Sequence, residues 1–80
     1  MQNDDFNILS KSELGSKIGQ RIKAIRQEKG ISQAELARLC VKDKQHIELI
    51  ENNKISANIY TLYIISNALK IELKTLFDFN

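Results

Sequence analysis

Residue types that build metal sites, disulfides and catalytic centres are scarce in this 80-residue chain. It has a single cysteine, which excludes an intrachain disulfide and a cysteine-rich zinc site. Its only histidine, His46, has no second histidine or cysteine cluster beside it, so we expect no metal and no other cofactor. The chain offers neither a nucleophile–base pair nor a glycine-rich phosphate loop, and we therefore expect that it is not an enzyme.

Long apolar runs are also missing. No stretch of about 18 apolar residues exists, so we expect no contact with a membrane. The first residues, Met-Gln-Asn-Asp-Asp-Phe, lack the basic and then apolar layout of a signal peptide. Proline and tryptophan are absent, and the composition of 42% hydrophobic and 28% charged residues is ordinary for a soluble helical domain. We expect one cytoplasmic domain, near the lower size limit for a self-sufficient core.

The positive charge is unevenly distributed, although the formal net charge is only +2. Residues 11–54 carry ten Lys or Arg against six Asp or Glu, whereas residues 1–10 carry two Asp and residues 55–80 are balanced. A basic surplus in one segment favours binding to phosphates, although many domains without a nucleic-acid role are similarly charged.

Capping signals and apolar spacing predict an all-α fold of five helices. Residues 1–10 are polar and are expected to form a loose tail, with residues 11–80 as the domain. Capping boxes at Ser10 and Ser32 start the first two helices, and Gly30 ends the first. Asp43 and Asn58 are expected N-caps for the third and fourth helices. The five expected ranges are 11–29, 33 to about 41, 44–51, 59 to about 69, and about 72–77.

The segment from Lys42 to Lys54 is the expected reading element. A helix, a tight turn and a second helix are the signature of a helix-turn-helix motif, which residues 33–51 match. At about 100° per residue, the third helix directs Ile47, Ile50 and Glu51 inward and presents a polar face on its other side. Such a face suits the DNA major groove, although most short amphipathic helices are merely scaffold.

From Ile18 to Phe77 the chain resembles the lambdoid-repressor-like helix-turn-helix family, also called the XRE or Cro/repressor type. The resemblance rests on the string Gly-Ile-Ser-Gln-Ala-Glu-Leu-Ala at residues 30–37, on Ile47 and Ile50-Glu51-Asn52, and on apolar positions near the C-terminus. It implies a five-helix lambda-repressor-like domain, with the helix-turn-helix at helices 2 and 3, that binds double-stranded operator DNA as a homodimer.

The resemblance also implies roles for particular residues. Arg26 and Glu51 match a structural ion pair that ties helix 1 to helix 3. Gln33 matches a position that contacts a phosphate and braces the reading helix. The matching base-reading positions are Lys44, Gln45 and Leu49, flanked by His46 and Glu48. The phosphate-contacting positions are Gln33, Lys42, Asn52, Asn53 and Lys54.

Four departures from the family pattern are visible in the sequence. The family usually has Gly where this chain has Val41, Asn53 and Lys70, and Pro where it has Ala57. Val41 matters most, because β-branched residues resist positive φ and the turn between helices 2 and 3 requires it. The register of residues 42–44 against DNA therefore depends on how this turn is made.

Some residues admit two interpretations. Cys40, on the apolar side of helix 2, is expected to be a buried structural thiol rather than a redox sensor. His46 is either solvated near phosphates or in contact with a base. Leu49 suits contact with a thymine methyl, and a protein-binding patch is its alternative.

Exposed apolar residues near the C-terminus predict a twofold dimer through helices 4 and 5, unless the tails or helix 5 cover them. The expected interface residues are Tyr60, Tyr63, Ile64, Phe77 and Phe79. The function expected is that of a sequence-specific transcriptional regulator, a repressor or small operon controller without an effector domain. The alternative is an antitoxin-like or other protein-interaction module that binds a partner such as a toxin, with DNA binding secondary.

Overall fold

The computed structural model of the protein describes residues 8–79, which contain four α-helices, one 3-10 helix and no strand. Residues 1–7 of the expected tail at 1–10 lie outside the described residues. The elements are α1 (Lys11–Glu28), α2 (Gln33–Cys40), α3 (Lys44–Glu51), α4 (Ile59–Ala68) and the 3-10 helix η1 (Leu73–Phe77).

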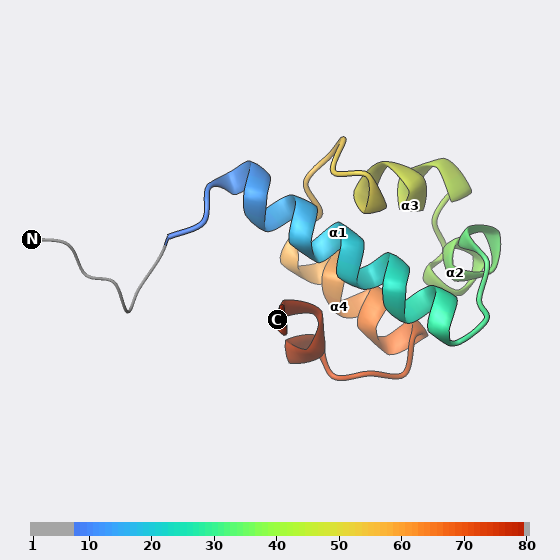
Figure 1. Cartoon of the computed structure of the whole chain (residues 1–80). Helices are drawn as coiled ribbons and strands as arrows, with labels where there is room; N and C mark the ends of the chain where they lie inside the picture. The colour runs from blue at the N-terminus through green and yellow to red at the C-terminus, as the bar shows by residue number, and fades with distance from the viewer. Residues whose placement is uncertain (1–7, 80) are drawn as a thin grey trace, which may run out of the picture.

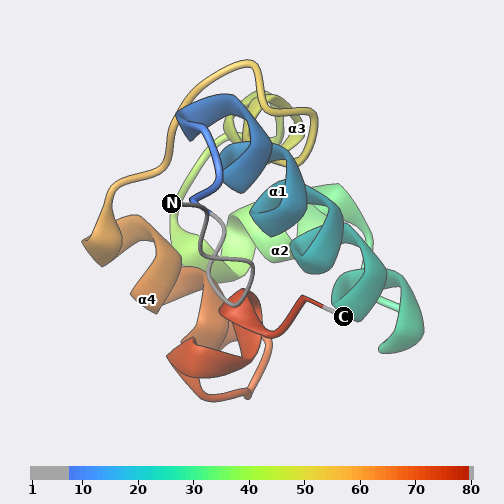
Figure 2. The same cartoon turned by 60° about the vertical axis from the view of Figure 1, so that its left-hand side comes forward.

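The long helix α1 runs through the middle of the molecule (Figure 1). The helix pair α2 and α3 lies at one end and along one side of it, and α4 with η1 lies on the other side. After a 60° turn, α3 is at the top and η1 at the bottom, so these two elements lie at opposite sides of the fold (Figure 2). The core between the elements is almost entirely aliphatic: Ile18, Ile22, Ile25, Leu36, Ala37, Cys40, Ile47, Ile50, Leu62, Ile65, Leu69 and Leu76.

The helices begin where local side chains can satisfy their first backbone amides. The Ser10 hydroxyl accepts from the Glu13 amide at 3.0 Å, and the Glu13 carboxylate accepts from the Ser10 amide at 2.8 Å, which completes the expected capping box. Ser32 and Asn58 cap α2 and α4 in the same way, although Ser32 makes only its half of the box. Asp43 holds the N-cap position of α3, but its side chain makes no capping hydrogen bond.

All four α-helices end in the same left-handed cap. After each helix one residue has φ between 54° and 71°, and the next amide donates back to a carbonyl five residues earlier. The four residues are Gly30, Val41, Asn53 and Lys70. Only Gly30 is the glycine that such a conformation favours. The turn geometry that Val41 made questionable is therefore retained, with a β-branched residue in a left-handed conformation.

Two expectations about the C-terminal half were wrong. The fifth helix is a 3-10 helix of five residues rather than an α-helix, because so short a segment closes with i→i+3 bonds such as Thr75 N to Glu72 O at 3.0 Å. The helical spacing of Ile59, Leu62, Ile65 and Leu69 predicts that all four face the core, but Ile59 is 68% exposed. It is the first residue of the helix, and the buried stripe begins one turn later at Leu62. No helix among the described residues is long and apolar enough to cross a membrane.

Candidate nucleic-acid interface

The helix α3 is held against the body of the protein by one apolar and one ionic contact surface. Ile47 is fully buried and Ile50 is 3% exposed, so the inward face of the expected wheel is confirmed. Glu51, one residue later, is 4% exposed and thus lies on the same buried face. The remaining side of this eight-residue helix is left for contacts outside the chain.

A glycine in α1 allows α3 to approach closely. A Cβ atom built on Gly19 would lie 2.6 Å from the Glu51 carbonyl oxygen and 2.7 Å from that of Ile50. Both atoms are backbone, so neither can turn aside as a side chain would. Only a residue without a Cβ lets the backbone of α1 meet the C-terminal end of α3 at this separation. The only signal of this role in the sequence is a glycine inside a strong helical pattern, where glycine costs stability.

The carboxylate of Glu51 is the centre of a buried hydrogen-bonded network. Arg26 donates to it twice, from Nε to Oε2 at 2.7 Å and from Nη2 to Oε1 at 3.0 Å. The two side chains are 8% and 1% exposed. Gln33 Nε2 donates to Oε1 at 3.0 Å, and Arg26 Nη1 donates to the Ile31 carbonyl oxygen at 2.9 Å. A carboxylate buried without partners would be costly. The network supplies these partners and thereby fixes α1, α2 and α3 relative to one another.

The outward side of α3 is polar and accessible within the described part of the chain. Lys44, Gln45 and Glu48 are exposed, and His46 and Leu49 are half-buried. The five expected base-reading residues therefore share one exposed helix, with their side chains outside the core. Leu49 is less exposed than a free apolar side chain would be, yet it is not part of the buried core.

Four of the five expected phosphate-contacting residues lie near the two ends of α3, and the fifth, Gln33, is the first residue of α2. Lys42 is half-buried at the start of α3, beside the exposed Val41, while Lys54 is exposed after its end. Asn52 Nδ2 donates to the Glu48 carbonyl oxygen at 3.0 Å, within its own helix. Asn53 Nδ2 donates instead to the Ser12 carbonyl oxygen of α1, also at 3.0 Å.

The contact between Asn53 and α1 was not foreseen. The Asn53 side chain occupies the space that a Cβ atom on Gly15 would take, so the glycine admits it. A second unforeseen contact joins α1 to η1, where Arg21 Nε donates to the Thr75 carbonyl oxygen at 3.0 Å. Both pairs are separated by 41 or more positions in the sequence, which no local pattern reveals.

The thiol of Cys40 is buried in the core, 3% exposed, at the end of α2. Burial raises the pKa of this thiol above its ordinary value, and the nearby positive charge of Lys42 opposes this in part. A raised pKa disfavours the reactive thiolate, so the geometry suits a structural role. Within residues 8–79, no three His, Cys, Asp or Glu side chains come together in a group that could hold a metal ion.

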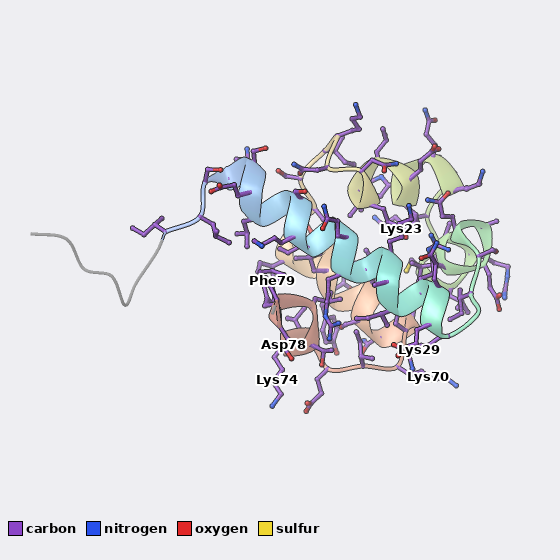
Figure 3. All side chains as sticks on the ribbon, in the orientation of Figure 1. Lys23, Lys29, Lys70, Lys74, Asp78 and Phe79 are labelled. Carbon is purple, nitrogen blue, oxygen red and sulfur yellow. The ribbon has the colours of Figure 1, made fainter. Side chains whose placement is uncertain are left out.

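The five expected interface residues fall into two groups. Tyr60 is 68% exposed and Tyr63 48%, and their rings lie 6.3 Å apart between centroids. Phe77 is 39% exposed. Ile64 and Phe79, by contrast, are partly buried and pack against the core; Figure 3 labels Phe79 at the end of the chain beside η1. The unexpectedly exposed Ile59 precedes Tyr60 at the start of α4.

Comparison with known proteins places these features in context. Residues 22–76 match the family model described as helix-turn-helix. The immunity repressor protein of Bacillus phage phi105 is 32% identical over 59 residues, which are 74% of this chain and 41% of the phage protein. The chain thus spans less than half the length of that relative.

Solved structures give the same picture. The restriction-modification controller protein C.AhdI from Aeromonas hydrophila is 32% identical, with a TM-score of 0.76 over 78% of this chain and 94% of its own. The master regulator for biofilm formation SinR, solved in complex with DNA, is 40% identical, with a TM-score of 0.71 over 76% of this chain and 98% of its own.

Proposed function

We propose that this chain, which belongs to the XRE-type helix-turn-helix family of DNA-binding transcription regulators, binds a specific operator through α3. In this proposal α3 enters the major groove, and the protein acts as a repressor or a small operon controller. The names of its relatives, an immunity repressor and a restriction-modification controller, support these two roles.

One observation carries the proposal: α3 divides cleanly into a buried face and a free polar face. Ile47, Ile50 and Glu51 are at most 4% exposed, while Lys44 and Gln45 are exposed in the first turn. In helix-turn-helix docking, the first turn of the motif's second helix, which here is α3, approaches the base edges. The network around Glu51 supplies the rigidity that a precise fit into a groove requires.

The side chains of this face suit base recognition. A lysine such as Lys44 donates to the O6 and N7 acceptors of guanine, and Gln45 can pair with the N6 and N7 positions of adenine. Leu49 suits a thymine methyl group, which offers an apolar contact in the same groove. His46 and Glu48 flank these positions. The negative charge of Glu48 disfavours a neighbouring phosphate, and its carboxylate can accept a hydrogen bond from a cytosine amine.

Phosphate contacts would fix the register of α3 on the duplex without reading sequence. Lys42 and Lys54, at opposite ends of α3, are the charged candidates; Gln33, Asn52 and Asn53 are the uncharged ones. The side chains of these three are already engaged within the fold, at Glu51, Glu48 and Ser12 respectively. Each amide retains a second N–H that can donate to a phosphate oxygen.

We further propose that the protein binds as a homodimer in the cytoplasm, through the exposed aromatic residues of α4 and η1. In this proposal Tyr60, Tyr63 and Phe77 supply the exposed contacts of the interface, whereas Ile64 and Phe79 are partly buried and pack against the core. Two copies related by a twofold axis would present their α3 helices to half-sites roughly 34 Å apart. Sedimentation equilibrium tests this point, and Tyr60→Glu should shift the protein toward monomer.

The decisive experiment is a fluorescence-anisotropy titration with duplexes from the upstream region of the protein's own gene. Lys44→Ala and Gln45→Ala should relax base preference by about 1–3 kcal/mol for each lost pair. The matched control is Lys74→Ala, which removes a lysine from η1, far from α3 (Figure 3). Unchanged base preference in both α3 variants would contradict the proposal.

The exposed tyrosines of α4 favour one alternative, in which the fold mainly captures a protein partner such as a toxin. In that case Leu49→Glu and Tyr60→Glu should abolish partner capture while DNA affinity is unchanged. If Tyr60→Glu instead weakens operator binding and dimerisation together, the dimeric regulator is supported.

A further inference from the structure

A groove lies between the first turn of α1 and the loop that follows α3. Its lining residues are Lys11, Ser12, Asn53, Lys54, Ile55 and Ser56, and its volume is about 320 Å³. These residues include two lysines, two serines and one asparagine, and none of them is acidic. A groove with this composition suits a phosphate group, which accepts hydrogen bonds and carries negative charge.

The two sides of the groove are joined rigidly. Asn53 Nδ2 donates to the Ser12 carbonyl oxygen at 3.0 Å, and Gly15 leaves the space that the Asn53 side chain occupies. Asn53 also forms the left-handed cap of α3. The position of Lys11 is therefore fixed relative to α3 through backbone and a single short side chain.

The cationic and hydroxyl groups of the groove are free to bind. Within residues 8–79, no hydrogen bond or ion pair engages the ammonium groups of Lys11 and Lys54 or the hydroxyl groups of Ser12 and Ser56. The nearest carboxylate in sequence, Glu13, accepts from the Ser10 amide in the capping box. An anion in the groove would thus meet side-chain donors without displacing an internal ion pair.

We propose that Lys11 and Ser12 of α1 act with Lys54 and Ser56 as a clamp on a phosphate of the DNA backbone, beyond the C-terminal end of α3. This inference rests on the proposed function, because α3 must lie in the major groove of DNA for the loop after it to reach the adjacent DNA strand. The match to the family model covers residues 22–76, so Lys11 and Ser12 lie outside it. The clamp is a contact that this chain adds to the matched part of the fold.

The test is the salt dependence of DNA binding. Each phosphate neutralised by a lysine contributes about −0.9 to the slope of log Kobs against log salt concentration. Lys11→Gln should reduce the magnitude of this slope by about 0.9 for each bound protomer and weaken operator and random duplexes by the same factor. Lys11→Arg should restore the slope, because it restores the charge.

Lys74→Gln is the matched control, since it makes the same charge change on an exposed lysine of η1 and should leave the slope unchanged. Circular dichroism melting confirms that all variants fold, as expected for exposed positions. If the wild type binds and the slopes of Lys11→Gln and Lys74→Gln coincide, the clamp is refuted and the proposed function stands. If the wild type binds no duplex even at low salt, the proposed function fails and the clamp fails with it.

Discussion

Replacing Val41 by glycine should stabilise the protein. Val41 has φ 54° and ψ 48°, in the left-handed region, and forms the turn between α2 and α3. This conformation costs an L-residue roughly 1–2 kcal/mol, and the branched Cβ of valine favours the upper end of that range. The residue is 90% exposed, so removal of its side chain sacrifices almost no buried surface.

An opposing effect arises in the unfolded chain, where glycine has more conformational freedom. That freedom costs roughly 0.4–1 kcal/mol of stability. The difference leaves a gain of about 1 kcal/mol for Val41→Gly, which corresponds to a rise of about 4–8 °C in Tm for a domain of this size. Urea denaturation followed by circular dichroism gives the free energy of unfolding and the m-value together.

Val41→Ala is the control, because alanine keeps the Cβ and loses only the branch. It should gain less than Val41→Gly. Asn53→Gly should not gain, although Asn53 has φ 56°, because it loses the hydrogen bond to Ser12. A loss of stability in Val41→Gly at an unchanged m-value would refute the reasoning, since it would mean that the left-handed turn carries no strain.

Three further outcomes are expected. Gly19→Ala should destabilise the fold by about 1–3 kcal/mol through overpacking, although alanine is normally the better helix former; Gly15→Ala, which meets only a side chain, should cost less in the same urea assay. Arg26→Ala should cost about 3–5 kcal/mol by leaving the Glu51 carboxylate buried and unpaired, and a folded variant that merely loses operator choice would contradict this. Cys40 should react slowly with a thiol reagent in the folded protein and rapidly in urea, because burial raises the pKa of its thiol. Any stability that the protonated thiol contributes is present below its ordinary pKa of 9.0 and is lost at higher pH.

The elements that sequence reasoning located best are those set by neighbouring residues. Ser10, Ser32 and Asn58 each cap a helix within three positions, and Gly30 ends α1 where the pattern indicated. The amphipathic division of α3 was also predictable, because the angle between successive side chains in a helix is fixed. The type of η1 was not, since a short apolar run is equally compatible with an α- or a 3-10 helix.

The candidate site was only partly predictable, for a related reason. The polar residues of α3 follow from its amphipathic pattern and from the family resemblance. Which backbone meets which was not encoded locally: Gly19 against Glu51 and Asn53 against Ser12 are contacts between distant segments. A glycine in a helix and an asparagine after one have many other uses, so their roles became evident only from the packing.

By itself, the sequence determined where helices start and stop, which face of each is apolar, and that one short helix carries an unusual set of polar groups. Those properties depend on hydrogen bonds and side-chain angles within a few residues. The tertiary structure alone decided how closely α1 and α3 approach, that Val41, Asn53 and Lys70 adopt left-handed conformations, and that Lys11 and Lys54 line the same groove. These outcomes depend on packing between segments tens of residues apart, where the energy of the whole core overrides the preference of any single residue.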